Sequence, residues 1–228
     1  MDIEGLKREA AYKAVDLVED GMIVGLGTGS TAKHAVDRVA WRIREEGIRV
    51  VGVPTSSRTR DQATSLGIPL ATLEQEPALD LAIDGADEIE VGTLSLIKGA
   101  GGALLQEKLV EVSAKTLVII ADETKKVEKL GGKFAVPVEV VRFGWKSTQE
   151  RLRALGCNPV LRGGVDTPYI TDEKHYLIDC DFGLIDDAEA LANQLKAICG
   201  VVEHGLFIGI AQRAILATTG GVETLFPK

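Results

Sequence analysis

The sequence predicts an α/β protein, in which a parallel sheet flanked by helices is joined to a smaller unit of mixed helices and strands. The first observation behind this prediction is that strand-like and helical apolar patterns alternate over residues 3–126. The second is the unbroken apolar run at 117–121, which is typical of a central strand in a parallel sheet. The third is a change, after Gly131 and Gly132, to short strand patterns with two helices.

The first part of the chain is expected to build the parallel sheet, because its strands and helices follow one another in turn. Helical patterns have apolar residues three and four positions apart, and buried strands are short apolar runs. The expected elements are a helix at 3–19, a strand at 22–26, a helix at 35–43, a strand at 49–53, a helix at 58–66, a short strand or connection at 68–71, a strand at 79–83, a helix at 104–112 and a strand at 117–121.

The part after Gly132 predicts an antiparallel sheet in a ββαββα-like arrangement. Its expected elements are strands at 136–141, 160–162, 169–170 and 175–180, and helices at 147–155 and 186–197. Two further apolar segments, 206–210 and 214–217, are expected to return to the first sheet. We therefore expect residues 1–130 and 207–228 to form the larger domain and residues 131–206 to form the smaller one.

Composition excludes several classes of protein. Of the 228 residues, 45% are hydrophobic, which is enough to bury a core. The net charge of −8 argues against a nucleic-acid surface, which needs clustered Lys and Arg. The three cysteines are odd in number and lack metal-ligand spacing, so they predict free thiols in a reducing compartment. Because neither a signal-peptide pattern nor an apolar stretch of ~18 residues is present, we expect a soluble, cytoplasmic protein without a membrane partner.

A glycine-rich turn follows the strand at 22–26 and leads into a helix. The hydroxyl groups of Thr28, Ser30 and Thr31, with the backbone N–H groups of a helix N-terminus, are suited to hold a phosphate. The turn also satisfies the dinucleotide fingerprint G-x-G-x-x-A, which raises the alternative of a dehydrogenase. That class needs an acidic residue after the next strand, where this sequence has Pro-Thr-Ser-Ser at 54–57. The sequence therefore favours a small phosphate ester over a dinucleotide.

Two more polar segments follow strands of the predicted sheet. The strand at 79–83 ends in two carboxylates, Asp84 and Asp87, which are separated only by Gly85 and Ala86. A polar turn after a strand is common, so this pattern by itself identifies no site. The central strand is likewise followed by Asp-Glu-Thr-Lys-Lys at 122–126. Because ligands collect at the carboxyl ends of parallel strands, these segments and the glycine-rich turn predict one shared pocket.

Four motifs resemble, in order and separation, those of the ribose-5-phosphate isomerase type A family. They are MIVGLGTGSTA at 22–32, DGADEI at 84–89, KGAGGAL at 98–104 and ADETK at 121–125, with VPVEV at 136–140 beyond them. The resemblance covers essentially the whole chain. It implies interconversion of D-ribose 5-phosphate and D-ribulose 5-phosphate through an enediol(ate), in the non-oxidative branch of the pentose phosphate pathway, without a metal or organic cofactor. It also implies a Rossmann-like domain carrying a smaller α+β (ferredoxin-like) domain, and we expect a homo-oligomer, either a dimer or a tetramer.

The chemistry of the residues agrees with this resemblance. Aldose–ketose isomerisation needs one base that moves a proton between C2 and C1, and groups that stabilise an enediolate. Glu107, in the helix after the second glycine-rich loop, is the candidate base. Lys98, together with the amides of Gly99, Ala100 and Gly101, is the candidate stabiliser of the oxyanion.

By resemblance, Asp84 and Asp87 contact the sugar hydroxyls and assist ring opening and proton exchange between O1 and O2. The sequence does not show which of the two aspartates has which role. Gly85 and Ala86, which lie between them, are also expected to contact the substrate. Many relatives have glycine where this chain has Ala100, and register alone selects Lys125 over the adjacent Lys126. The residues expected to hold the phosphate are Lys7, Thr28, Gly29, Ser30, Thr31 and Lys125.

Three other classes of function are compatible with parts of the sequence. A sugar-phosphate sensor needs the phosphate-binding turn but no base, so Glu107 beside Lys98 argues against it. Acyl-CoA transfer through a nucleophilic glutamate occurs on related folds, but the hydroxyl-rich turn suits a small sugar better. A magnesium site at the Asp-x-x-Asp of 84–87 lacks companion ligands.

Overall fold

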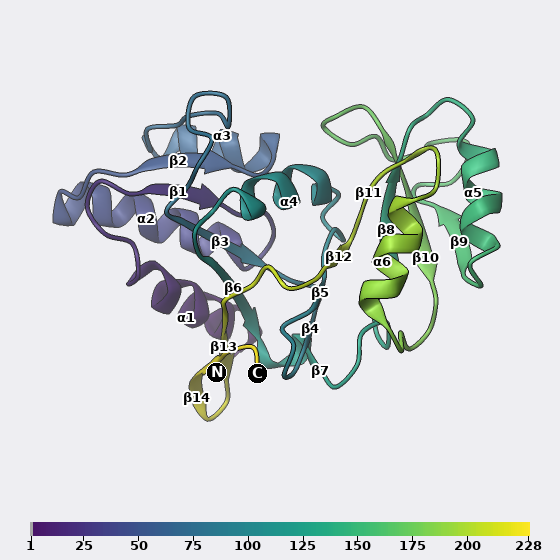
Figure 1. Cartoon of the computed structure of the whole chain (residues 1–228). Coiled ribbons are helices and arrows are strands. Elements are labelled where there is room, and N and C mark those ends of the chain that lie inside the picture. The colour runs from purple at the N-terminus through teal and green to yellow at the C-terminus, as the bar shows by residue number, and fades with distance from the viewer. Residues whose placement is uncertain (1) are drawn as a thin grey trace.

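The structure, a computed structural model, describes residues 2–228. Its strands form a six-stranded sheet, a four-stranded antiparallel sheet and a second, smaller four-stranded sheet. Figure 1 shows the small sheet between the other two. None of the helices within residues 2–228 is both long enough and apolar enough to cross a membrane.

The six-stranded sheet has the strand order β14-β13-β6-β3-β1-β2. Its strands are β1 (Ile23–Leu26), β2 (Val51–Pro54), β3 (Leu81–Gly85), β6 (Leu117–Asp122), β13 (Arg213–Thr218) and β14 (Gly221–Leu225). The first five run parallel to one another, and β14 runs antiparallel to β13. The predicted parallel sheet is confirmed, and the segment at 214–217 returns to it as expected.

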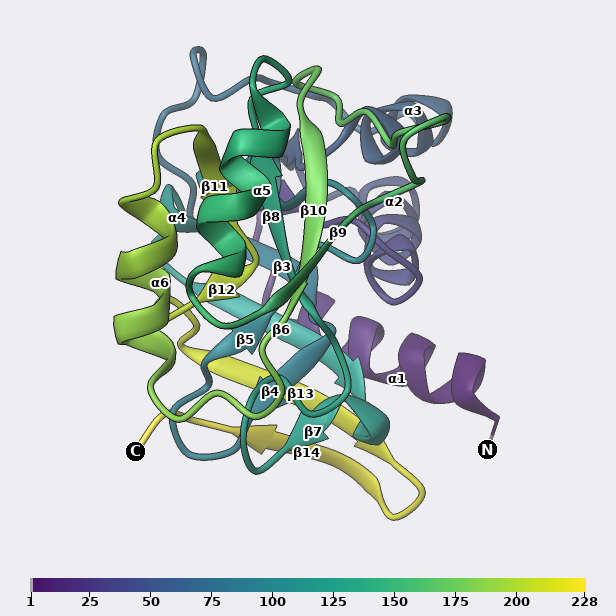
Figure 2. The same ribbon diagram turned by 90° about the vertical axis from the view of Figure 1, so that its right-hand side faces the viewer.

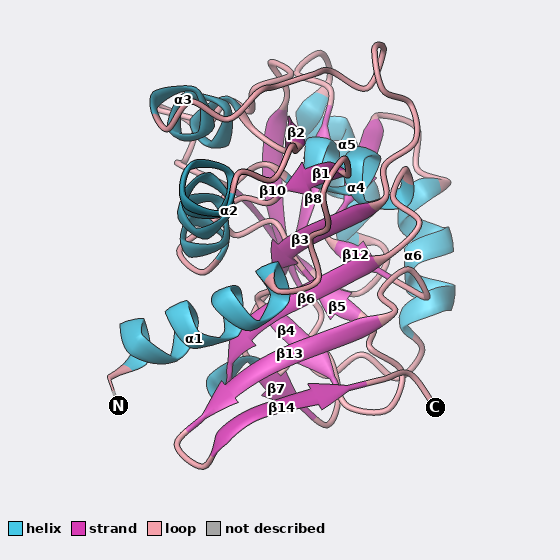
Figure 3. Cartoon of the chain, turned by 90° about the vertical axis from the view of Figure 1, so that its left-hand side faces the viewer, coloured by secondary structure: helices cyan, strands magenta, loops and turns pink. Residues whose placement is uncertain are grey.

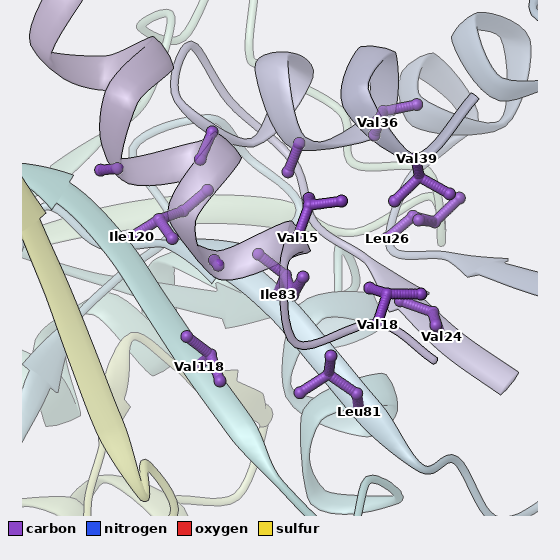
Figure 4. Close-up of a cluster of buried hydrophobic side chains, with 14 of the residues drawn as sticks. Val15, Val18, Val24, Leu26, Val36, Val39, Leu81, Ile83, Val118 and Ile120 are labelled. Carbon is purple, nitrogen blue, oxygen red and sulfur yellow. The ribbon is translucent and has the colours of Figure 1, made fainter. Parts of the chain in front are cut away.

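Helices cover both faces of this sheet. They are α1 (Ile3–Val15), α2 (Ala32–Glu46), α3 (Ser57–Ser65) and α4 (Leu104–Val112). Figure 3 shows α1 and α2 against one face, and Figure 4 shows Ile83, Val118 and Ile120 in the core that they share. The alternate residues Ala82, Ile119 and Ala121 pack toward the other face, where they join a core with Leu104 of α4. Burial on both faces explains the unbroken apolar run of β6.

The first helix ends four residues before the predicted boundary at 19. Beyond Val15, the N–H groups of Leu17 and Val18 donate to Ala14 and Val15, three positions back, which tightens the chain into a turn. Leu17 and Val18 still pack against the core, and this explains why their apolar positions continue the helical pattern.

The small sheet has the order β12-β5-β4-β7 and corrects one prediction. Its strands are β4 (Glu88–Glu90), β5 (Leu96–Ile97), β7 (Lys126–Val127) and β12 (Leu206–Phe207). The segment at 206–210 was expected in the first sheet, but Leu206 and Phe207 pair with β5 instead. This pairing buries Phe207 beside Leu104 and Leu96, so the segment has the apolar character of a core strand without belonging to the large sheet.

The third sheet contains β8 (Val136–Val140), β9 (Asn158–Leu161), β10 (Tyr176–Asp181) and β11 (Val201–His204). Helices α5 (Trp145–Arg153) and α6 (Ala188–Lys196) lie on the side away from the larger sheet, as Figure 2 shows. The order β11-β8-β10-β9, with antiparallel pairs and the chain order βαββαβ, is the ferredoxin-like arrangement. The expected order ββαββα was wrong, because residues 169–170 form no strand and an unexpected strand, β11, follows α6. Residues 169–170 lie in the long connection between β9 and β10, where Ile170 makes only one isolated bridge.

Candidate active site

A cavity lies at the carboxyl edge of the six-stranded sheet, where the turns after β1 and β3 meet the loop before α4. This is the shared pocket that the sequence predicts. The residues that line it are Thr28, Gly29, Ser30, Thr31, Gly85, Ala86, Asp87, Lys98, Gly99, Gly101, Glu107 and Lys125.

The turn after β1 presents a helix N-terminus to the cavity. Thr31 occupies the N-cap position of α2 but makes no side-chain cap hydrogen bond. The N–H groups of Lys33 and His34 donate to Gly29 O and Thr31 O, so the backbone donors left for an anion are those of the turn just before Lys33. Lys7, on α1, donates to Ser30 Oγ at 3.0 Å. Lys125 lines the cavity from the short 3₁₀ helix that follows β6. A dianionic group bound at this end would therefore meet backbone donors, hydroxyls and two lysines.

Thr28 has a different role from its neighbours in the turn. Its hydroxyl is buried and lies within hydrogen-bond distance of the hydroxyls of Thr55, Ser56 and Thr59, at 2.7, 2.7 and 3.0 Å. Its N–H donates to Asp84 Oδ1 at 2.9 Å. Thr28 thus fastens the turn to β2, α3 and β3, and the open hydroxyls for a ligand are those of Ser30 and Thr31.

Lys98 is the buried cation of the site, with a side chain only 2% exposed. Its ammonium group donates to the carbonyl oxygen of Gly85 at 2.5 Å and lies 3.2 Å from Asp84 Oδ2 and 2.9 Å from Glu111 Oε1. Burial by itself lowers the pKa of Lys98, but the carboxyl groups of Asp84, Glu107 and Glu111 outweigh burial and raise the pKa above its ordinary value. Lys98 is therefore charged at any physiological pH.

Glu107 lies in the first turns of α4 and is 4% exposed. Its Oε2 atom has no hydrogen-bond partner among residues 2–228, although Glu107 lines the cavity. Burial raises the pKa of Glu107 to about 8, against the opposing effect of the Lys98 charge. A carboxyl group with such a pKa gains and loses a proton near neutral pH, as a general acid–base must.

The two aspartates after β3 occupy different positions. Asp84 is fully buried and holds Thr28, Gly85 and Lys98 in place. Asp87 lines the cavity, and its Oδ2 accepts a hydrogen bond from the N–H of Ala100 at 2.9 Å. Burial raises the pKa of Asp87 above its usual range, although Lys98 and two other cations oppose this effect.

Two residues at the site were missed by the sequence analysis. Glu111, one helical turn after Glu107, faces Lys98, and its spacing of four positions was a usable signal. Arg162, which directly follows β9, donates to the carbonyl oxygens of Gly99 and Ala100. It also forms an ion pair with Asp179. No local pattern relates Arg162 to a loop more than sixty residues earlier in the chain.

The comparisons with known proteins agree with this geometry. The family model described as ribose 5-phosphate isomerase A (phosphoriboisomerase A) matches residues 51–221. The chain belongs to the ribose 5-phosphate isomerase A family. It is 64% identical over 221 residues to ribose-5-phosphate isomerase A of Synechococcus sp. (strain JA-3-3Ab), covering 96% of each chain.

Two solved structures of this family have nearly the same fold. The ribose 5-phosphate isomerase A of Methanocaldococcus jannaschii is 44% identical, with a TM-score of 0.94 and coverage of 99% of this chain and 100% of the other. A D-ribose-5-phosphate isomerase in complex with phospho-erythronic acid is 40% identical, with a TM-score of 0.95 and the same coverage.

In this member of the ribose 5-phosphate isomerase A family, every residue lining the cavity is one that the sequence analysis selected. Three selected residues do not line it. Lys7 contacts Ser30, Asp84 lies beneath the cavity, and Ala100 is exposed while its N–H is used by Asp87. Lys126, the alternative to Lys125, pairs with Glu223 at 2.8 Å instead.

The close approach of Gly27 to β3 gives a prediction for the stability of this isomerase-family chain. A Cβ atom at Gly27 would lie 2.5 Å from the carbonyl oxygen of Ile83 and closer still to the Asp84 carboxylate. We expect Gly27→Ala to lower the free energy of unfolding by about 1–3 kcal/mol, because overpacking forces the buried backbone to shift.

Chemical denaturation measures this effect, and Gly85→Ala is the matched control. A Cβ atom at Gly85 would have Ile120 O as its nearest neighbour, at 3.8 Å, which is ordinary contact. Equal unfolding midpoints for the two variants would show that the turn after β1 is not held as tightly against β3 as the structure indicates.

Proposed function

We propose that the protein interconverts D-ribose 5-phosphate and D-ribulose 5-phosphate through an enediolate, with Glu107 as the base that moves the proton between C2 and C1. The observation that carries this proposal is one cavity with a buried, raised-pKa carboxyl group and a phosphate-binding turn among its lining residues. A phosphorylated sugar spanning the cavity would have its phosphate at the turn and its carbonyl end at Glu107 and Lys98.

The reaction begins from the open-chain aldose. Glu107 takes the proton from C2, the C1=C2 double bond forms, and the carbonyl electrons move to O1. The proton of the O2 hydroxyl then passes to O1, and C1 takes its proton back from Glu107 as the C2=O bond of the ketose forms, so that one carboxyl group serves both carbon atoms. This use of a single group requires a pKa near neutrality, which burial gives to Glu107.

Lys98 stabilises the enediolate through its charge. The ammonium group already has three partners, Gly85 O, Asp84 and Glu111, so a direct hydrogen bond to substrate would have to replace one of them. Since the cation is fixed and shielded from water, its field acts on a developing oxyanion without reorganisation. The phospho-erythronic acid bound by a structural neighbour supports an enediolate intermediate, because its carboxylate has the charge of an enediolate.

Asp84 and Asp87 have different positions, and we assign them different roles. We assign Asp87, which lines the cavity, to the sugar hydroxyls and to ring opening and proton exchange between O1 and O2. Asp84 instead orients Lys98 and the turn at Thr28. The phosphate is held by the N-terminus of α2, Ser30, Thr31 and Lys125, with Lys7 acting through Ser30.

Purified protein incubated with ribose 5-phosphate provides the test of this function. Ribulose 5-phosphate is expected to form until a fixed ratio of the two sugars is reached, and the same ratio is expected from the ketose side. Absence of conversion in both directions, in protein shown to be folded, would contradict the proposal.

Metal independence is a further prediction. Within residues 2–228, no group of three or more His, Cys, Asp or Glu side chains is arranged to hold a metal ion. The cation of the site is instead Lys98, which contacts Asp84 and Glu111 and whose charge acts on Glu107. Activity is therefore expected to survive exhaustive chelation. Loss of activity on chelation, followed by recovery with one divalent ion, would contradict this.

We also propose a domain division, a cellular location and an oligomeric state for this enzyme. The division into a larger domain of residues 1–130 and 207–228 and a smaller one of 131–206 is supported by the separate six-stranded and ferredoxin-like sheets. Action in the cytoplasm is supported by the free thiols of Cys157, Cys180 and Cys199. A homo-oligomer, a dimer or a tetramer, is part of the same proposal, and its size in solution is measured by light scattering.

A further inference from the structure

Glu111 is a buried carboxyl group that the proposed reaction does not use directly. It lies one turn after Glu107 on α4 and is 2% exposed. Its Oε1 atom is 2.9 Å from the ammonium nitrogen of Lys98, and neither of its oxygens has a hydrogen-bond donor elsewhere in residues 2–228. A buried carboxylate without donors is strongly unfavourable. The contact with Lys98 is therefore the interaction through which Glu111 can act.

We propose that Glu111 is a positioning residue, whose carboxyl group holds Lys98 between β3 and α4 and thereby sets the distance of the cation from Glu107. This inference rests on the proposed function, in which Glu107 is the base. Glu111 itself does not line the cavity, so it acts on the substrate only through Lys98 and Glu107.

The contacts of Lys98 show why an anchor on α4 is needed. Its partners Gly85 and Asp84 both belong to β3, so they fix the ammonium group only from the side of the sheet. Glu111 is its ion-pair partner on the helix that also contains Glu107. Glu111 thus sets the position of the cation relative to the base.

The charges around Glu111 determine the sign of its effect on Glu107. The titratable groups that face it are Lys98 and Asp84 from the sheet side and Glu107 from its own helix. Lys108 is turned away, toward Glu203 and the carbonyl oxygens of His204 and Leu206. Burial, with the nearby carboxylates, raises the pKa of Glu111 well above its ordinary value, although Lys98 lowers it. The neutral form of Glu111 is therefore favoured, so Glu111 acts on Glu107 through the position of Lys98, whose charge lowers the pKa of Glu107.

Glu111→Ala removes the contact with Lys98, whereas Glu111→Gln keeps an oxygen acceptor for it. We expect Glu111→Ala to lower kcat about 100-fold by displacing Lys98. The acid limb of its kcat/KM profile should move up by about one pH unit, because a displaced Lys98 lowers the pKa of Glu107 less. The ¹³C titration of the Glu107 carboxyl carbon, assigned by its absence in Glu107→Gln, should move in the same direction in the ligand-free protein. Glu111→Gln should rescue kcat and bring the acid limb back toward its wild-type position.

The control is Glu139→Gln, a change at another glutamate that is 1% exposed, in the third sheet beside Thr171 and His175. It should leave the acid limb in place. A limb and a carboxyl titration that coincide in wild type and Glu111→Ala would overturn the inference; if Glu111→Ala fails to fold, the same comparison is made with Glu111→Leu, which fills the space but has no acceptor. Because the ¹³C titration needs no turnover, it tests Glu111 separately from the proposed function, which fails only if wild type does not isomerise the sugar.

Discussion

Glu107→Gln is expected to lower kcat by about 10²–10⁴-fold, the usual cost of losing a general base. Glutamine keeps the size of the side chain and an oxygen acceptor, but it cannot take a proton at neutral pH. Because Glu107 is buried among other groups of the site, the glutamine should still fit its position on α4. Steady-state kinetics with ribose 5-phosphate measures the effect.

Binding of a phosphorylated sugar acid is the control for Glu107→Gln. Its affinity should change far less than kcat, since the phosphate-binding turn is untouched. A near-normal kcat would rule out Glu107 as the base. If affinity fell in parallel with kcat, Glu107 would be a group that positions the substrate, and the base would have to be another carboxylate of the cavity.

Loss of the phosphate contacts is expected to have the second large effect. Ser30→Ala with Thr31→Ala should raise KM strongly, because charge-assisted hydrogen bonds contribute about 1.5–3 kcal/mol each before compensation. Unphosphorylated ribose should be a very poor substrate for the same reason. The measurements are KM for the double variant and kcat/KM for the two sugars.

Thr64→Ala is the matched control, because Thr64 is an exposed hydroxyl residue on α3. Its KM should equal that of wild type. Equal turnover of ribose and ribose 5-phosphate would place the phosphate, or the whole substrate, somewhere other than the turn after β1.

The sequence predicted that the candidate residues meet in one cavity, because most of them follow the ends of strands. Parallel strands bring the segments at 27–32, 84–87 and 122–126 to one edge of the sheet, and a pattern of strands and turns is enough to show this. Lys98 and Glu107 were found because a glycine-rich loop precedes a helix N-terminus. These are local features with a simple spatial consequence.

Other features depend on contacts between distant segments. The inward rotation of the Thr28 hydroxyl depends on Thr55, Ser56 and Thr59, which belong to another strand and helix. Arg162 reaches the loop at 99–100 only because the ferredoxin-like sheet is docked beside it. Leu206 and Phe207 have the pattern of any buried strand, so their pairing with β5 rather than with the large sheet was not predictable.

Exchange of carbon-bound hydrogen with solvent tests the central claim most directly. When wild-type protein turns over ribose 5-phosphate in D₂O, a base-mediated enediolate predicts deuterium at C1 of ribulose 5-phosphate and at C2 of recovered ribose 5-phosphate, both visible by NMR. Glu107→Gln should incorporate deuterium at neither carbon on the same timescale. Isomerisation with complete retention of the original hydrogen, or undiminished exchange in Glu107→Gln, would contradict the assignment of Glu107 as the base.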